Sequence, residues 1–302
     1  MRKSKQRPPT TPRPRGGGFL DSFTEAQLDD WTRGGDLLQK LADKVYFELE
    51  ALRAAKYDSL CDALRSSPGV SLDVNGWSRV TDYRWSLSPL SPAGSIKGIG
   101  GRFNIGETLD RARGQAFPCL YIAQSVETAF AEYFGESLST QMGPLTLGEL
   151  ALRRDSSFTT FLLNGRIERV LDIREENSLK PFAEIIRHFS ISWLTKAAFR
   201  SAGLPQREII RSAKQLRRRL LMESKLWRQE PTVFGIPVAS QIFGRFARDA
   251  DWEAILYPSG RGNGLCLGIF TENFQASDSR IDVVGEVPDG ATHTILDKDH
   301  LR

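Results

Sequence analysis

Apolar positions along the chain form short continuous runs in some segments and three- to four-residue repeats in others, which predicts a mixture of strands and helices. Residues 118–123 are an apolar run typical of a short buried strand. Ser125 follows as a helix cap, and the predicted helix carries one apolar face made of Val126, Ala129, Phe130, Tyr133 and Phe134. The pattern therefore predicts a strand that leads directly into an amphipathic helix.

Further strands are predicted in the second half of the chain. Residues 159–163 and 169–173 flank Asn164-Gly165, a dipeptide typical of tight hairpin turns. Three more apolar runs predict strands at 252–258, 265–270 and 281–287. The hairpin indicates a sheet that is partly antiparallel.

The first third of the chain is predicted to be helical from Thr24 to about Ser66. Gly34-Gly35 and Asp36 mark the expected start of the longer helix, whose apolar repeat is Leu38, Leu41, Val45, Leu49 and Leu52. We expect a helical hairpin that packs on the rest of the chain. The alternative is that it packs on a partner protein or on a second subunit.

Residues 177–230 are predicted to be mostly helical and to end in a strongly basic helix. Its basic residues are Arg207, Arg211, Lys214, Arg217, Arg218, Arg219, Lys225 and Arg228, and its apolar face is Ile209, Ile210, Ala213, Leu216 and Leu220. The charges are most simply a solvated outer surface. A docking surface for an acidic protein is the alternative. Another helix is predicted at 238–247.

Charge and composition set outer limits on function. The net charge is +4, but residues 1–18 hold six basic side chains and no acid, which leaves −2 for the rest. This tail is expected to be disordered. No apolar run approaches the roughly 18 residues of a membrane span, and no signal peptide is evident, so we expect a cytoplasmic protein.

Metal and redox chemistry are not indicated. The chain has three histidines, no Cys-x-x-Cys motif and three cysteines that are far apart, namely Cys61, Cys119 and Cys266. Cys119 and Cys266 lie in apolar runs, so we expect them to be small buried hydrophobic residues. We therefore expect no metal.

A glycine-rich stretch from Gly98 to Gly106 is the first candidate binding element. Its glycines permit positive φ and close approach to a ligand, and Arg102 and Asn104 offer donors for phosphate or sugar oxygens. The spacing fits neither a P-loop nor a dinucleotide fingerprint.

Two further polar residues stand at the ends of predicted elements. Glu132 lies on the flank of the apolar helix face, where a carboxylate can be held rigidly, whereas Glu127 is explained by the helix dipole. Ser259 ends the 252–258 strand on a Gly/Pro turn. Tyr257 replaces the first glycine of Gly-x-Ser-x-Gly, so a hydrolase nucleophile elbow is disfavoured.

Together these segments resemble the RES domain family, which is named for an arginine, a glutamate and a serine. The likeness covers roughly residues 75 to 275 and is interrupted by a long middle segment that typical short members lack. It rests on Tyr83-Arg84-Trp85, Gly100-Gly101-Arg102-Phe103-Asn104, Leu120-Tyr121-Ile122-Ala123, Glu132 and Ile255-Leu256-Tyr257-Pro258-Ser259.

The resemblance implies an α+β fold similar to ADP-ribosyltransferases of the diphtheria-toxin type, with a partly antiparallel split sheet and flanking helices. Here it is joined to an N-terminal helical appendage. We expect a basic tail at 1–23, the appendage at 24–72, a catalytic domain at 73–290 with an insertion around 177–232, and a C-terminal tail at 291–302.

The resemblance also implies site roles directed at NAD as substrate. A fixed carboxylate at Glu132 would stabilise the positive charge that develops on the ribose, and nicotinamide leaves without needing a proton, so no histidine is required. Arg84 is the first candidate for clamping phosphate or ribose, and Arg102 is the second. The other predicted site residues are Trp85, Phe103, Asn104, Tyr121 as a stacking or hydroxyl-donating group, and Ser259 as a hydrogen-bond donor to ribose or Glu132.

Two positions depart from the family pattern. Trp85 stands where some members carry tyrosine, and Phe103 where others carry tryptophan or tyrosine. A hydrogen bond is therefore lost from each position, although stacking survives both changes. The middle segment leaves the acceptor open among water, phosphate and a protein side chain.

Three functions remain open. The first is a bacterial toxin that cleaves the nicotinamide–ribose bond and depletes NAD, held in check by an antitoxin or immunity protein. The second is an ADP-ribosyltransferase that modifies a protein. The third is a nucleic-acid-binding module, which lacks the aromatic residues that stacking readers interleave with basic ones. A toxin could also be delivered into the cytoplasm of another cell.

Overall fold

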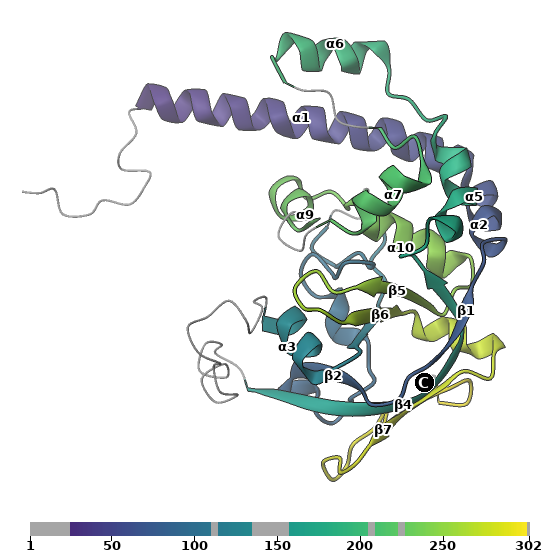
Figure 1. Cartoon of the computed structure of the whole chain (residues 1–302). Coiled ribbons are helices and arrows are strands. Elements are labelled where there is room, and N and C mark those ends of the chain that lie inside the picture. Colours follow the sequence, from purple (N-terminus) through teal and green to yellow (C-terminus); the bar gives the residue numbers. More distant parts are fainter. Residues whose placement is uncertain (1–24, 110–113, 135–156, 205–208, 223–226, 301–302) are drawn as a thin grey trace, which may run out of the picture.

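One mixed sheet organises the protein (Figure 1). The computed structural model describes residues 25–109, 114–134, 157–204, 209–222 and 227–300. Its strands are β1 Val70–Asp73, β2 Trp77–Asp82, β3 Leu120–Ala123, β4 Phe158–Asp172, β5 Ala254–Pro258, β6 Leu265–Ile269, β7 Arg280–Val284 and β8 Ile295–Leu296. They follow the order β2-β3-β6-β5-β4-β7-β8, and β1 and β2 also pair with β4.

The long strand β4 pairs with different strands along its length: with β2 and β7 near its start, and with β1 and β5 near its end. Near its start, Leu162 lies opposite Ser78 of β2 on one side and Val284 of β7 on the other. Near its end, Val170 lies opposite Val70 of β1 and Ala254 of β5. Among the described strands, β4 and β5 form the one parallel pair. The fold is therefore α+β with a largely antiparallel sheet, as the sequence predicts.

The predicted hairpin at Asn164-Gly165 is wrong, because β4 continues through both residues. Asn164 closes a different turn: its Oδ1 accepts the N–H of Gly76, between β1 and β2, at 2.8 Å. Gly165 allows β7 to come close, since a Cβ atom built there would lie 2.0 Å from the carbonyl oxygen of Arg280. The dipeptide serves strand packing here instead of a turn.

The helices cover the sheet on the side of α10 and extend beyond it (Figure 1). They are α1 Glu25–Ala55, α2 Tyr57–Arg65, α3 Val126–Phe134, α5 Glu176–Ile186, α6 Trp193–Ser201, α7 Ala213–Leu220, α9 Gln229–Phe234 and α10 Ala239–Asp249. In the described chain, none is both long and apolar enough to cross a membrane. No group of His, Cys, Asp or Glu side chains there is arranged to hold a metal ion.

The N-terminal helices differ from the predicted hairpin. Helix α1 begins at Glu25 and runs through Gly34 and Gly35, because a glycine in a helix costs only about 1 kcal/mol, which the rest of a long helix offsets. Helix α2 packs mainly against α5 and α10 and not along α1. Its Leu60 and Leu64 are fully buried in the core that α5 and α10 share.

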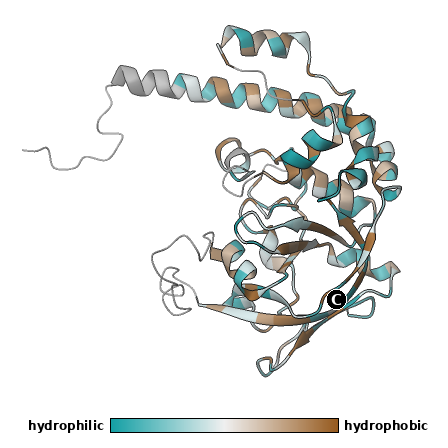
Figure 2. Cartoon of the chain, viewed as in Figure 1, coloured by the Kyte–Doolittle hydropathy of each residue, from teal (hydrophilic) through white to brown (hydrophobic). Residues whose placement is uncertain are grey.

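The predicted long basic helix is also shorter in the structure. Within the described stretch 209–222, Ala213–Leu220 is helical as α7; Arg211 precedes this helix and Arg228 follows it. Helix α7 starts directly after Ser212, because the Ser212 side chain caps it by accepting the N–H of Gln215 at 3.2 Å. Figure 2 shows α7 as mainly hydrophilic, while its Leu216 and Leu220 are buried. Arg207, Lys225 and the basic tail lie outside the described residues.

Apolar side chains form a core on each face of the sheet. One core contains Ile255 and Tyr257 of β5 with the helices, and the other contains Ala254 and Leu256 from the opposite face of the same strand. Cys61, Cys119 and Cys266 are all buried and free, so the prediction of buried hydrophobic cysteines is confirmed.

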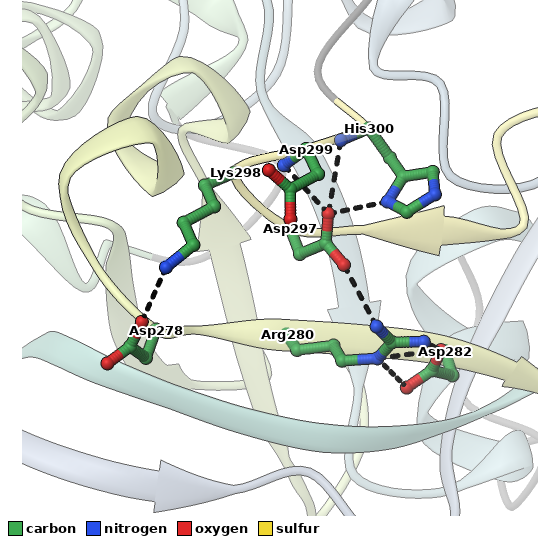
Figure 3. Close-up of polar contacts among 7 residues, drawn as sticks. All are labelled: Asp278, Arg280, Asp282, Asp297, Lys298, Asp299 and His300. Carbon is green, nitrogen blue, oxygen red and sulfur yellow. Dashed lines mark hydrogen bonds and ion pairs between the residues drawn. The ribbon is translucent and has the colours of Figure 1, made fainter.

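The C-terminal segment expected as a tail at 291–302 contains β8, which is fastened to the sheet (Figure 3). Arg280 of β7 donates to Asp282 and, at 3.0 Å, to Asp297 Oδ2. His300 Nδ1 lies 2.6 Å from Asp297 Oδ1. Burial acts to raise the pKa of Asp297, but hydrogen bonds from His300 and from backbone N–H groups outweigh it and lower that pKa. The cluster ties the end of the chain to β7.

The close contact at Gly165 gives a first test of the fold. Gly165→Ala is expected to lower the free energy of unfolding by about 1–3 kcal/mol, because the added methyl group meets the backbone of β7. Gly34→Ala is the matched control: no atom lies within 4 Å of its added Cβ, and it should stabilise α1 by up to about 1 kcal/mol. Denaturant unfolding measures both, and equal effects of the two changes would contradict the placement of Gly165.

Candidate functional site

A cavity lies where β2, β3 and α3 meet the ends of β5 and β6. Its volume is about 750 Å³ including the open space at its mouth. Polar groups reach it from four elements: Arg102 from the glycine-rich stretch, Tyr121 from β3, Glu132 from α3 and Tyr257 from β5. A second cavity of about 950 Å³, between α1, α5, α7 and α10, has a mainly apolar lining. The first cavity is therefore the better candidate for a functional site, because its wall carries both acidic and basic side chains.

Glu132 is held by the turn that follows β5. The hydroxyl of Ser259 donates to Glu132 Oε1 at 2.5 Å, and the N–H of Gly260 donates to the same oxygen at 2.9 Å. Ser259 Oγ in turn accepts the N–H of Gly262 at 2.8 Å and of Arg261 at 3.1 Å. No donor in the described chain reaches Glu132 Oε2. The carboxylate is thus oriented through one oxygen, which leaves the other for a ligand.

Arg102 brings a buried positive charge to the same cavity. Its side chain is 5% exposed, and its Nη1 donates to the carbonyl oxygen of Leu220 at 3.3 Å. Its Cζ lies 5.7 Å from the centre of the Tyr257 ring. Among the described residues, nothing accepts a hydrogen bond from its buried Nη2. An unpaired buried donor is costly, and an anionic ligand in the cavity would satisfy it.

Buried hydrogen bonds fix the backbone that carries Arg102. Asn104 Oδ1 accepts the N–H of Gly101 at 2.9 Å and the hydroxyl of Tyr121 at 2.8 Å. The Tyr121 hydroxyl accepts the N–H of Phe103 at 2.9 Å. Gln241 of α10 donates through Nε2 to the carbonyl oxygens of Ile99, Gly101 and Asn104 at 2.8–3.1 Å. Arg102 therefore projects from a rigid loop.

The glycines of this loop chiefly allow the loop to fold on itself. Gly100 has φ +86°, and a Cβ atom there would lie 2.4 Å from the carbonyl oxygen of Asn104. A Cβ atom on Gly106 would lie 2.1 Å from the backbone nitrogen of Gly100. Among these glycines only Gly101 lines the cavity, and a Cβ atom there would lie 2.5 Å from the Tyr121 ring. The predicted close approach of a ligand stays a prediction.

Three other ionisable groups in the cavity wall are kept neutral. Burial raises the pKa of Cys266 well above its usual range, and it does the same for Tyr121 and Tyr257. None of these groups is therefore a thiolate or phenolate nucleophile near neutral pH. The charged groups of the wall are Glu132, Arg102 and Arg228.

Comparison with known proteins adds the family. A family model described as the RES domain matches residues 77–288, which is more than half of the chain. The chain belongs to the RES domain family. A chain of the crystal structure of the M. tuberculosis MbcT–MbcA toxin–antitoxin complex is similar over 75% of this chain and 90% of that one, with 15% identity and a TM-score of 0.40. No curated protein sequence matches.

Five predicted site residues of this RES domain do not line the cavity. Ser259 is one of them and acts on it through its hydrogen bond to Glu132. Arg84 has an exposed side chain that pairs with Asp82 at 2.8 Å, and Trp85 lies beside it with Lys97 5.8 Å from the centre of its ring. Phe103 is fully buried and packs on Tyr257 behind the cavity. The amide of Asn104 is used within the loop, so its role is support.

Sequence reasoning missed several residues of the RES domain site. Asp82 accepts from both Arg84 and the hydroxyl of Tyr133, which places Arg84 near the cavity through two intervening side chains. Gln241 is buried in α10, where nothing in a helix pattern distinguishes an outward polar residue from an inward one. Trp227 and Arg228 also line the cavity, although the charge pattern placed Arg228 on a solvated helix.

The hydroxyl of Tyr121 tests this arrangement. Tyr121→Phe is expected to lower the free energy of unfolding by about 1–3 kcal/mol, because the buried N–H of Phe103 loses its acceptor. Tyr83→Phe is the matched control, since Tyr83 is 61% exposed. Thermal unfolding compares the two, and an unchanged melting temperature for Tyr121→Phe would show that its hydroxyl does not hold the loop.

Proposed function

We propose that this RES domain protein is a toxin that cleaves the bond between nicotinamide and ribose in NAD. One observation carries the proposal: an oriented carboxylate with an open oxygen, on Glu132, shares a cavity with a buried guanidinium that has an unpaired donor, on Arg102. NAD carries a cationic pyridinium–ribose unit and an anionic pyrophosphate, so its charges match this pair.

The chemistry proposed for the cavity requires no proton on the leaving group. The electron pair of the C–N bond stays with the pyridinium nitrogen, which leaves as neutral nicotinamide, and positive charge develops on the ribose. Glu132, held by Ser259 and the N–H of Gly260, stabilises that charge. An acceptor oxygen then bonds to the ribose carbon and, if the acceptor is water, releases its proton to give ADP-ribose.

Arg102 is proposed to hold the pyrophosphate. A guanidinium binds phosphate oxygens through paired N–H donors, and Arg102 Nη2 is buried and unpaired among the described residues. Its other hydrogen bond, to the Leu220 carbonyl, fixes its direction. Arg84 would act only at the rim, through Asp82 and Tyr133.

Depletion of NAD would arrest growth, so a neutralising protein is proposed as the partner in the producing cell. Phosphate is an alternative acceptor to water, and transfer of ADP-ribose to a protein is the alternative activity. The nucleic-acid alternative has less support, because Arg211 lies outside α7 and Arg228 lines the cavity, so the described basic residues do not form one exposed helix face. Location in the cytoplasm is also part of the proposal.

The role of Glu132 is tested by its neutral analogue. Glu132→Gln is expected to reduce nicotinamide release from NAD by about 10²–10³-fold, because the charge that stabilises the ribose cation is lost while the side chain keeps its shape. Glu127→Gln, an exposed change on the same helix, should leave release unchanged. Chromatography of nicotinamide, with and without phosphate, provides the measurement.

The competing outcomes separate the alternatives. Label from adenine-labelled NAD on a protein band, with no free ADP-ribose, would favour the transferase. Wild-type protein that releases no nicotinamide, with or without a lysate, would overturn the proposal, and so would full activity in Glu132→Gln.

A further inference from the structure

The middle segment, which interrupts the family pattern, contributes part of the cavity wall. Trp227 and Arg228 follow α7 in the chain and line the cavity together with residues of β2, β3, α3 and β5. The carbonyl oxygen of Leu220, the last residue of α7, accepts the hydrogen bond from Arg102. The insertion thus reaches the site at two points.

Trp227 and Arg228 form a defined aromatic and cationic unit. Trp227 is 4% exposed, and the Cζ atom of Arg228 lies 5.0 Å from the centre of its ring. Arg228 itself is exposed, so its charge lies on the solvent side of the cavity. Such a pair can place a flat base beside a ring and a phosphate beside a guanidinium.

The other aromatic rings of the cavity, those of Tyr257, Tyr121 and Tyr133, already have partners. The Tyr133 ring lies 4.9 Å from that of Phe134 and 6.4 Å from that of Phe158, between ring centres. The Tyr257 ring packs on Phe103, with 4.9 Å between ring centres, and has Arg102 near its face. The Tyr121 ring lies under Gly101, where an added Cβ atom would be 2.5 Å from it. The insertion adds the ring of Trp227 to the wall, and this ring is therefore assigned to a second planar group of the ligand.

We propose that Trp227 and Arg228 determine specificity for a dinucleotide by recognising its adenosine phosphate half, with the adenine on Trp227 and the adenosine-side phosphate on Arg228. The inference rests on the proposed function, because it assigns the other half of the ligand to Glu132 and Arg102. Nicotinamide mononucleotide lacks the adenosine phosphate half, so it provides a direct comparison.

The test measures kcat/KM for NAD and for nicotinamide mononucleotide, together with calorimetric binding of ADP-ribose, which needs no reaction. For Arg228→Ala we expect the preference for NAD over the mononucleotide to fall about 10- to 100-fold, and ADP-ribose to bind more weakly by a similar factor. Trp227→Ala should act likewise, and Trp227→Phe should retain most of the preference because stacking survives.

Two controls come from the same insertion. Trp193, 72% exposed at the start of α6, and Arg200, exposed near its end, are outside the cavity lining. Trp193→Ala and Arg200→Ala should leave both measurements unchanged. Thermal unfolding of every variant identifies a loss of fold, and Arg228→Ala, an exposed change, keeps the test available if Trp227→Ala unfolds.

The outcomes distinguish this inference from the proposed function. Equal losses for NAD and the mononucleotide, or unchanged ADP-ribose affinity in folded Arg228→Ala, would overturn the inference and leave NAD cleavage in place. Wild-type protein that neither cleaves NAD nor binds ADP-ribose would overturn both.

Discussion

The site depends on one buried contact, in which the side chain of Gln241 holds the glycine-rich loop. Gln241 is fully buried in α10, and its amide donates to three carbonyl oxygens of the loop while its Oε1 accepts the N–H of Val238. Buried carbonyl groups need such partners, because leaving them unpaired costs about 1–3 kcal/mol each. The contact sets the path of the backbone on either side of Arg102. A buried arginine can then keep an unpaired donor at a cavity, since the loop that carries it is rigid.

The two charged groups of the cavity are positioned by different parts of the sheet. Glu132 comes from α3, directly after β3, and is oriented by the turn after β5; β3 and β5 both pair with β6. Arg102 is positioned from outside the sheet, by α10 and by the end of α7. The sheet therefore brings carboxylate and serine together, while the helices of one face set the guanidinium opposite them. Helices α7 and α10 share one apolar core with the sheet, which links the insertion to the region around the cavity.

Local patterns in the sequence predicted much of the fold and part of the site. The β3–α3 unit, β5, β6 and α10 have strong apolar patterns, and Glu132 and Ser259 stand at the ends of such elements. The Asn164-Gly165 hairpin failed because a glycine needed for close strand packing looks the same in sequence as one needed for a turn. From the sequence, Arg84 ranked above Arg102 as the phosphate clamp, because a sequence gives the order of residues but not their burial. Only the structure reveals that Arg102 has a buried donor, Nη2, without an acceptor among the described residues. Trp227 and Gln241 carry no local signal: Gln241 acts through loop residues about 140 positions away, and Trp227 through a cavity that distant segments of the chain build together.

The central claim is that Glu132 and Arg102 hold the nicotinamide ribose and the pyrophosphate of one NAD molecule. The most direct measurement is a crystal structure of Glu132→Gln soaked with intact NAD. We expect the nicotinamide ribose beside residue 132 and the pyrophosphate within hydrogen-bond distance of Arg102 Nη2. An NAD molecule bound elsewhere, or a pyrophosphate held by Arg84 with Arg102 still unpaired, would contradict the claim.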